Sequence, residues 1–227
     1  MALYAISDFH LSFGTDKPMD IFKGWANYTE RLKENIEKTV GDNDTIVIPG
    51  DISWAMKLKD TLDDFKFLES LPGKKIIGKG NHDLWWESLT KMNRFLEEND
   101  IKTVNFLFNN CFVVDDIAIC GSRGWFFDDT ADKKIVLREA GRIETSIKSA
   151  LVTGKEPVLF LHYPPLSKTD VCTEIMDVIK KYDIKTVYYG HIHLAGKFKA
   201  YEGEYDGINF KCISCDLLNF MPVLIKS

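Results

Sequence analysis

The sequence predicts an α/β fold, of the α+β type, in which helices lie outside a pair of mixed β-sheets. Through the first half of the chain, short apolar runs rich in β-branched residues alternate with amphipathic segments. This is the pattern of parallel strands joined by crossover helices. From about residue 187 onward helical periodicity is absent, as in β-hairpins. The chain has 227 residues, 45% apolar and 28% charged, without a linker, so we expect one domain over residues 1–227.

The individual elements follow from the spacing of the apolar residues. Where these recur every three or four positions, the sequence predicts helices over residues 22–40, 58–70, 84–98, 132–152 and 170–182. Compact apolar runs predict strands over residues 3–7, 45–49, 74–78, 103–107, 112–116, 117–121, 157–162, 186–190, 197–201, 208–213 and 222–226. The segment EGEYDG, residues 202–207, predicts a turn between two of these strands.

Charge and hydropathy exclude several classes of function. The formal net charge is -5, which provides no basic surface for a nucleic acid backbone and disfavours a nucleic acid polymer as partner. No run of about 18 apolar residues predicts a membrane span, and we expect no membrane contact. The amino terminus lacks the basic and apolar regions of a secretory leader. We therefore expect a cytoplasmic protein.

The five cysteines do not predict disulfide bonds. Their number is odd and they are scattered along the chain, so reduced thiols in the core are the preferred interpretation. Cys212 and Cys215 form a C-x-x-C pair. A structural zinc site would require a second pair of ligands, and a redox motif would begin a helix.

Polar side chains follow five of the predicted strands at the points where those strands end. They are Asp8, His10, Asp51, Asn81, His82, Asp83, His162, His191 and His193, and they include every histidine of the chain. Ligand sites of α/β sheets lie outside the carboxyl ends of the strands, so we expect these side chains to converge in one crevice. In the D-x-H and H-x-H segments, residues two apart on extended backbone would point to the same side.

The chemistry of this set favours a metal site. A single aspartate at a strand end is usually a turn former, and a single histidine usually a structural hydrogen bonder, but the ordered set is more specific than any member. Imidazoles, carboxylates and one amide suit Mn, Fe or Zn, with Mg, Co and Ni also compatible. Seven ligands exceed the needs of one tetrahedral ion and suit two divalent ions that share a bridging carboxylate.

The order of these residues resembles the motifs D-x-H, G-D, G-N-H-[DE], H and G-H-x-H of the calcineurin-like metallophosphoesterase superfamily. In this chain they are Asp8-Phe9-His10, Gly50-Asp51, Gly80-Asn81-His82-Asp83, His162 and Gly190-His191-Ile192-His193. The resemblance implies a four-layer α-β-β-α sandwich. It also implies one ion bound by Asp8, His10, Asp51 and His193. The second ion would be bound by Asn81, His162 and His191, with Asp51 as the bridge.

The activity implied by the resemblance is that of a dinuclear metal-dependent phosphohydrolase. In-line attack of a metal-bound hydroxide would cleave a phosphomonoester or phosphodiester bond of a small phosphorylated substrate. The expected catalytic residues are Asp51 and His82, of which His82 would protonate the leaving oxygen or stabilise its charge. Asp83 is expected to secure its loop through backbone hydrogen bonds. Arg123 follows another apolar run and, with His82, is our candidate for binding a phosphate oxygen; a turn arginine paired with a surface acid is the alternative.

One departure from the pattern limits what the resemblance implies. Protein serine/threonine phosphatases of this superfamily have a second acid three residues after the G-D aspartate, and this acid orients the catalytic histidine. Trp54 occupies that position here, which disfavours a protein phosphatase and leaves the partner of His82 open. Two alternatives remain. A nuclease acting on short oligonucleotides should add a basic groove, and a non-catalytic metal-binding scaffold should have lost ligands. No obligate protein partner is evident.

Overall fold

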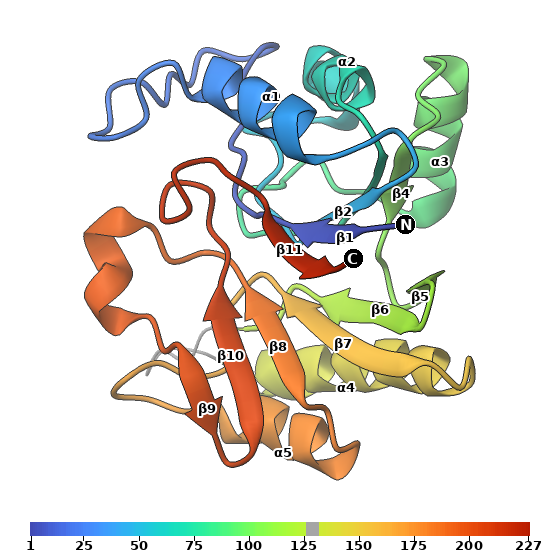
Figure 1. The fold of residues 1–227 in the computed structure, drawn as a ribbon, viewed down its shortest axis with the longest axis vertical. Helices are drawn as coiled ribbons and strands as arrows, with labels where there is room; N and C mark the ends of the chain where they lie inside the picture. Colours follow the sequence, from blue (N-terminus) through green and yellow to red (C-terminus); the bar gives the residue numbers. More distant parts are fainter. Residues whose placement is uncertain (126–131) are drawn as a thin grey trace.

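Two β-sheets lie face to face between two layers of helices in the computed structural model, which describes residues 1–125 and 132–227 (Figure 1). Within these residues, the first sheet has five strands in the order β11-β1-β2-β3-β4, and the second has six in the order β5-β6-β7-β8-β10-β9. Both sheets are mixed, because β11, β5 and β9 run antiparallel at edges of otherwise parallel strands. The predicted fold class is confirmed.

The strands are short and the helices lie on the outer faces of the sheets. The first sheet contains β1 (Leu3–Ala5), β2 (Thr45–Ile48), β3 (Lys74–Ile77), β4 (Val104–Phe106) and β11 (Val223–Lys226). The second contains β5 (Cys111–Val114), β6 (Ile117–Ser122), β7 (Glu156–Leu161), β8 (Thr186–Tyr189), β9 (Gly203–Tyr205) and β10 (Ile208–Cys212). The helices are α1 (Tyr28–Thr39), α2 (Leu62–Ser70), α3 (Leu89–Glu98), α4 (Lys133–Leu151) and α5 (Thr173–Lys181), with short 3₁₀ helices η1 (Leu58–Thr61) and η2 (Leu194–Lys199).

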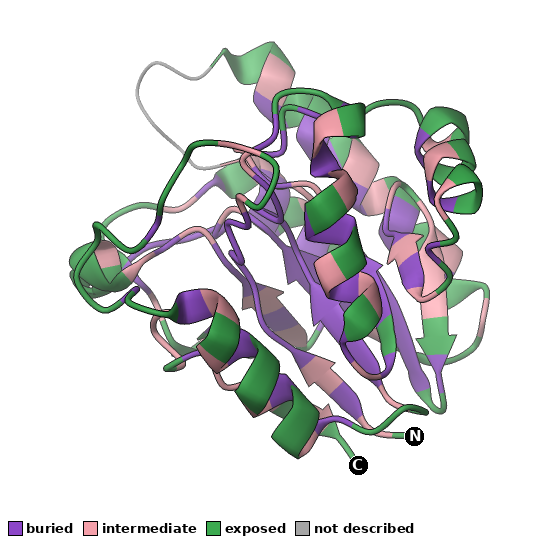
Figure 2. Cartoon of the chain, turned by 90° about the horizontal axis from the view of Figure 1, so that it is seen from above, coloured by how far each residue is buried: buried purple, intermediate pink, exposed green. Residues whose placement is uncertain are grey.

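Three layers of apolar side chains hold the sandwich together. The helices α1, α2 and α3 pack on the first sheet, α4 and α5 pack on the second, and the third layer lies between the sheets. Strand β2 shows how the sequence produces this arrangement. Ile46 and Ile48 point toward the helices, whereas Val47 points toward the opposite sheet, because successive side chains of a strand lie on opposite faces. Figure 2 shows the buried strands between helices whose outer faces are exposed.

The structure corrects several predicted elements. Residues 197–201 are not a strand. The 3₁₀ helix η2 covers most of them, since the amides of Gly196 and Ala200 donate to carbonyls three residues back. The predicted turn over residues 202–207 includes strand β9, and only Asp206 and Gly207 form the turn of the β9–β10 hairpin. Both have positive φ angles, of 52° and 76°, as a two-residue type I′ turn requires.

The helices are shorter than predicted mainly at their amino ends. Residues 22–27 and 84–88 precede α1 and α3 as turns rather than as helix. In the second of these turns Trp85 and Trp86 are buried in the core, so their apolar character reflects packing of a loop and not helical periodicity. No helix in the described ranges is both long and apolar enough to traverse a lipid bilayer.

Candidate metal centre

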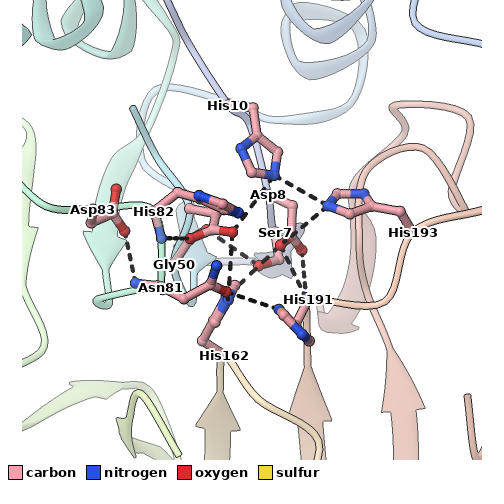
Figure 3. A network of polar contacts seen from close by, with 12 residues as sticks. Ser7, Asp8, His10, Gly50, Asn81, His82, Asp83, His162, His191 and His193 are labelled. Carbon is pink, nitrogen blue, oxygen red and sulfur yellow. Dashed lines mark hydrogen bonds and ion pairs between the residues drawn. The ribbon is translucent and has the colours of Figure 1, made fainter. Parts of the chain in front are cut away.

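The structure brings all seven predicted ligand residues together where strands of both sheets end. Asp8 and His10 follow β1, Asp51 follows β2, Asn81 follows β3, His162 follows β7, and His191 and His193 follow β8. Figure 3 shows six of these side chains pointing toward one another from both sheets: Asp8, His10, Asn81, His162, His191 and His193. Five parallel strands therefore deliver their carboxyl ends to one crevice, as expected for this class of fold.

Sharp turns, rather than extended backbone, aim these side chains into the crevice. Asp8, His10, Asp51 and His191 have φ angles of 63°, 48°, 51° and 68°, a left-handed region that residues other than glycine rarely occupy. The expectation that the D-x-H and H-x-H pairs are extended is therefore wrong. A strained conformation of this kind persists only where the surrounding structure imposes it, and it is concentrated at functional sites.

One group of side chains contains Asp8, His10 and His193. The Nε2 atoms of His10 and His193 face each other at 3.1 Å, and Asp8 Oδ1 lies 4.0 Å from the same nitrogen of His193. One potential ligand atom from each residue lies within 4.8 Å of the other two. Two nitrogens bound to one tetrahedral ion at about 2.0–2.1 Å would lie roughly 3.3 Å apart, close to the observed spacing.

The second group contains Asp51, His162 and His191, with Asn81 between the two histidines. The side-chain oxygen of Asn81 lies 2.7 Å from His162 Nε2 and 2.9 Å from His191 Nδ1. Potential ligand atoms of the two histidines and Asp51 again lie within 4.8 Å of one another. His191 and His193 thus belong to different groups although they are two residues apart.

Asp51 lies between the two groups. Its Oδ2 atom is 3.6 Å from His10 Nε2 and 3.5 Å from His162 Nε2. Its Oδ1 atom accepts a hydrogen bond of 2.8 Å from the backbone amide of His82, which fixes the orientation of the carboxylate. One oxygen is therefore held by the protein, while the other faces nitrogens of both groups.

The residues present fit a pair of bound cations. The Nε2 atoms of His10 and His162 face Asp51 Oδ2 at 3.6 and 3.5 Å, whereas their Nδ1 atoms are buried without a hydrogen-bond partner in the described residues. The inward-facing atoms are imidazole nitrogens, carboxylate oxygens and an amide oxygen, which are the ligand types of divalent transition metals. Asp8, Asp51 and His162 are almost completely buried, so bulk water does not reach them.

Burial also shifts the protonation equilibria of the site. It raises the pKa of the Asp51 carboxyl to about 9, and the carboxyls of Asp83 and Asp8 add to the shift. The pKa values of His10 and His162 are lowered far below the usual range, again mainly by burial. Desolvation thus favours the uncharged form of each group. Divalent cations would reverse the shift at Asp51, because they stabilise the carboxylate.

Asp83 secures the loop that carries Asn81, as predicted. Its Oδ1 atom accepts hydrogen bonds from the backbone amides of Ile52 and Ser53 at 2.9 and 3.2 Å, and Oδ2 accepts one from Gly80 at 2.7 Å. The loops after β2 and β3 are therefore joined through one buried carboxylate. This connection fixes the position of Asp51 relative to Asn81.

Comparison with known proteins agrees with this geometry. A profile of the calcineurin-like phosphoesterase family matches residues 1–195. The chain belongs to this family. The protein is accordingly a metal-dependent phosphoester hydrolase. A search of curated proteins found no match to it.

Solved structures from three organisms share the fold of this phosphoesterase. TT1561 of Thermus thermophilus has a TM-score of 0.59 and 15% identity, covering 99% of this chain and 98% of that one. The phosphopantetheinyl hydrolase PptH of Mycobacterium tuberculosis has a TM-score of 0.52 and 16% identity, covering 94% and 89%. AQ665 of Aquifex aeolicus, titled a protein of unknown function, has a TM-score of 0.51 and 17% identity, covering 98% and 95%. At these identities the likeness concerns the fold alone.

The phosphoesterase holds the His82 ring beside the candidate metal centre without an acidic partner. The ring is half-buried and lies 4.2 Å from the ring of Trp54, centroid to centroid, and 5.5 Å from that of His10. Within residues 1–125 and 132–227 no side chain forms a hydrogen bond with this imidazole. Burial, followed by the charge of His193, lowers the pKa of His82. His82 thus packs against Trp54, the residue three positions after Asp51.

Arg123 lies at the end of β6, one strand away from the two groups. Its carbonyl oxygen accepts hydrogen bonds from the amides of His162 and Tyr163 at 3.1 and 2.8 Å. Its guanidinium lies over the ring of Trp125, at 4.8 Å from the centroid. No carboxylate in the described part of the chain forms an ion pair with it, so these residues give no support to the alternative of a turn arginine paired with a surface acid. The side chain instead lines a separate pocket.

Two residues near the site were missed in the sequence. Asp216 Oδ1 lies 3.2 Å from His193 Nδ1, and its other oxygen accepts a hydrogen bond of 2.8 Å from the amide of Leu194. Cys215 donates through its sulfur to the carbonyl oxygen of Asp8 at 3.0 Å. The sequence contained a signal for both, because residues 214–216 follow β10, another parallel strand that ends at the same edge. The C-x-x-C pair, Cys212 and Cys215, therefore packs in the protein interior. Both cysteines are buried, and none of the five cysteines of the chain forms a disulfide bond.

Asp216 is expected to position His193. A carboxylate that accepts from the second nitrogen of a histidine ligand fixes the ring and its tautomer, and its loss typically costs tenfold to a hundredfold in metal affinity. We expect Asp216→Asn to weaken binding of Mn²⁺ or Zn²⁺ by about tenfold to a hundredfold, measured by competition with a chelator. Asp42→Asn, at an exposed position in the turn before β2, is the control. Equal affinities in the two variants would contradict the positioning role.

Three glycines of the motifs leave room for the site. A Cβ atom on Gly50 would lie 2.6 Å from Gly80 N and 2.8 Å from His162 Nδ1, and one on Gly80 would overlap the backbone and carboxylate of Asp51. A Cβ on Gly190 would overlap Ser7 and Asp8 in the same way. The glycines are thus required by close approach of the loops.

A pair of alanine substitutions tests this steric requirement. Gly80→Ala should lower the free energy of unfolding by at least about 2 kcal/mol, because the added methyl has no space beside Asp51. Gly141→Ala, within helix α4 with no atom near the new methyl, should raise it by about 0.5–1 kcal/mol. Urea denaturation measures both. A tolerated Gly80→Ala would show that the loops do not approach each other so closely.

Proposed function

We propose that this phosphoesterase uses two divalent metal ions to hydrolyse a phosphomonoester or phosphodiester bond of a small phosphorylated substrate. The two groups of side chains described above would each hold one ion, with Asp51 as the shared ligand. The position of Asp51 Oδ2, 3.6 Å from a nitrogen of one group and 3.5 Å from a nitrogen of the other, is the observation on which the proposal rests. A carboxylate in that place joins the two groups into one centre.

Asn81 sets the charge of the proposed centre. Its amide oxygen is neutral, so Asp8 and Asp51 are the only carboxylates among the seven ligand residues. Two divalent ions would therefore leave an excess of positive charge that attracts a phosphate. When bound, such ions supply Lewis acidity toward the phosphoryl oxygens and lower the pKa of water that attacks phosphorus.

His82 is the residue of the chain best placed to handle the leaving group. Its ring is half-buried and lies 5.5 Å from the ring of His10, centroid to centroid. In the protonated form the imidazole would donate a proton to the leaving oxygen, and its lowered pKa makes that proton easier to transfer. The backbone amide of His82 meanwhile holds Asp51 in orientation.

The test is a matched assay of metal content and hydrolysis. Purified protein is loaded separately with Mn, Mg, Zn or Fe, and elemental analysis counts the ions per chain. Hydrolysis of p-nitrophenyl phosphate is then compared with that of bis(p-nitrophenyl) phosphate and of short single-stranded DNA. Two ions per chain and turnover of a nitrophenyl ester support the proposal. One ion per chain, or full occupancy without turnover of any phosphoester, would overturn it.

The same assay separates the alternatives. Preferred cleavage of the oligonucleotide would indicate a nuclease, against which the net charge of -5 argues. Full metal occupancy without hydrolysis would indicate a scaffold. We also propose a cytoplasmic location without an obligate protein partner. The five unpaired cysteines support a reducing compartment.

A further inference from the structure

A small basic pocket lies beside the candidate metal centre. It has a volume of about 100 Å³ and is lined by Lys79, Ser122, Arg123, Glu139 and Arg142, together with two apolar residues that follow β4. None of these residues belongs to the seven proposed ligands. Three of them are cations and one is an acid, so the pocket carries an excess of positive charge.

The pocket continues the crevice by one strand in each sheet. Its walls come from helix α4 and from the carboxyl ends of β3, β4 and β6, whereas the metal centre uses β1, β2 and β3 with β7 and β8. Strands β3 and β4 are neighbours, as are β6 and β7. Lys79 precedes Gly80 and Asn81 in one loop, and the Arg123 carbonyl accepts the amide of His162. The segments that line the pocket are therefore joined directly to segments that carry the candidate metal centre.

Only one of the three cations has an acidic partner within the described residues. Glu139 is buried, and its Oε2 atom accepts a hydrogen bond of 2.9 Å from Arg142 Nη1. Its Oε1 atom accepts from the Ser122 hydroxyl and, at 3.2 Å, from the amide of Gly124. Both carboxylate oxygens are thus occupied. Glu139 thus holds Arg142 in place, and in the described residues it forms no ion pair with Lys79 or Arg123.

Arg123 is prepared to receive an anion. Its Nε atom is buried without a hydrogen-bond partner among residues 1–125 and 132–227, and its guanidinium is stacked on Trp125, which restricts its orientation. A planar fork of fixed orientation matches the oxygens of a phosphate. The volume of the pocket limits the size of the group that it can bind, because sites for whole drug-sized ligands have volumes of roughly 300–1,000 Å³. The space suits one phosphoryl group and not a nucleoside.

We propose that Lys79, Arg123 and Arg142 form a second anion subsite, which binds a phosphoryl group of the substrate other than the one that is hydrolysed. The substrate class is therefore small molecules that carry two phosphoryl groups. This inference rests on the proposed function, since the metal centre must bind the first group. A fixed subsite differs from a general positive field in its effect on the substrate. It requires a particular distance between the two phosphoryl groups of the substrate.

The experiment uses alkanediol bisphosphates of increasing chain length and the corresponding monophosphates with metal-loaded protein. At one chain length, kcat/KM for the bisphosphate should exceed that for the monophosphate by at least tenfold. The reason is that the second phosphoryl group would form charge-assisted hydrogen bonds, which are stronger than hydrogen bonds between neutral groups. Arg123→Gln should reduce this ratio at least tenfold, mainly through KM, and Arg123→Lys should restore part of it. Arg138→Gln, an exposed arginine of helix α4, should leave the ratio within about twofold.

The outcomes separate the two proposals. A bisphosphate preference that is absent, independent of chain length or unchanged in Arg123→Gln overturns the subsite while leaving the phosphohydrolase intact. If no phosphoester is hydrolysed, the proposed function fails. In that case calorimetric titration with butane-1,4-diol bisphosphate still decides the subsite, because Arg123→Gln must bind it at least tenfold more weakly than the wild type. Thermal melts confirm that each variant is folded.

Discussion

Asp51→Asn is expected to abolish activity and to prevent binding of the pair of metal ions. The oxygen that faces His10 and His162 would lose its negative charge, and a neutral amide cannot share two cations in the way a carboxylate does. We expect hydrolysis to fall by at least about a thousandfold, because electrostatic stabilisation at the reacting group is lost. Elemental analysis should find at most one ion per chain. The exposed Asp42→Asn should retain both ions and full turnover.

Thermal stability provides a second readout of the same substitution. Burial raises the pKa of Asp51 to about 9, well above the usual 3.8 of an aspartic acid. A carboxyl with a raised pKa loses its contribution to stability as the pH increases from about 4 toward 9. In metal-free protein at pH 7, asparagine should therefore be no less stable than aspartate. Metal should raise the melting temperature of the wild type more than that of Asp51→Asn, which binds at most one ion per chain. Equal stabilisation of both would contradict the shared-ligand role.

His82→Ala should retain both metal ions but reduce kcat about a hundredfold or more, the usual contribution of general acid–base catalysis. The ring is half-buried and makes no hydrogen bond with another side chain in the described residues, so its removal should change the melting temperature little. The backbone amide, which holds Asp51, remains in the variant. Elemental analysis and steady-state kinetics measure the two effects.

The leaving group distinguishes proton donation from a merely structural role. If His82 protonates the leaving oxygen, its loss should slow hydrolysis of an alkyl phosphate much more than that of p-nitrophenyl phosphate, whose phenolate leaves without a proton. Leu84→Ala, an exposed position of the same loop, should change both rates by less than about twofold. Equal losses with the two esters in His82→Ala would rule out the acid role and leave a role in positioning.

Much of the fold and of the site could be predicted because both depend on local sequence patterns. Apolar residues at every second position indicate the buried face of a strand, and apolar residues at every third or fourth position indicate the buried face of a helix. Polar residues directly after an apolar run mark the end of a strand. Predictions failed where packing overrode these patterns. Phe198 lies in a run with strand-like alternation, yet it is exposed in a 3₁₀ helix. Trp85 and Trp86 lie in a helix-like run, yet they are buried in a turn.

The candidate site shows the same limits at the level of single residues. Asp83 could be assigned to its loop because it is adjacent to the motif that it supports. Asp216 contacts His193 from 23 residues away, and no spacing rule connects them. Trp54 left the partner of His82 open at the level of sequence, and only the structure showed the aromatic contact between these two residues.

The amino-acid sequence alone determined the fold class, the family motifs and the identity of the residues that line the crevice, since these depend on residue types and their order along the chain. Only the tertiary structure decided which oxygen of Asp51 faces both groups, that His191 and His193 belong to different groups, and that Lys79, Arg123 and Arg142 share a pocket. These relations depend on sharp backbone turns and on the packing of one sheet against the other. Both bring together atoms from strands that are distant in the sequence.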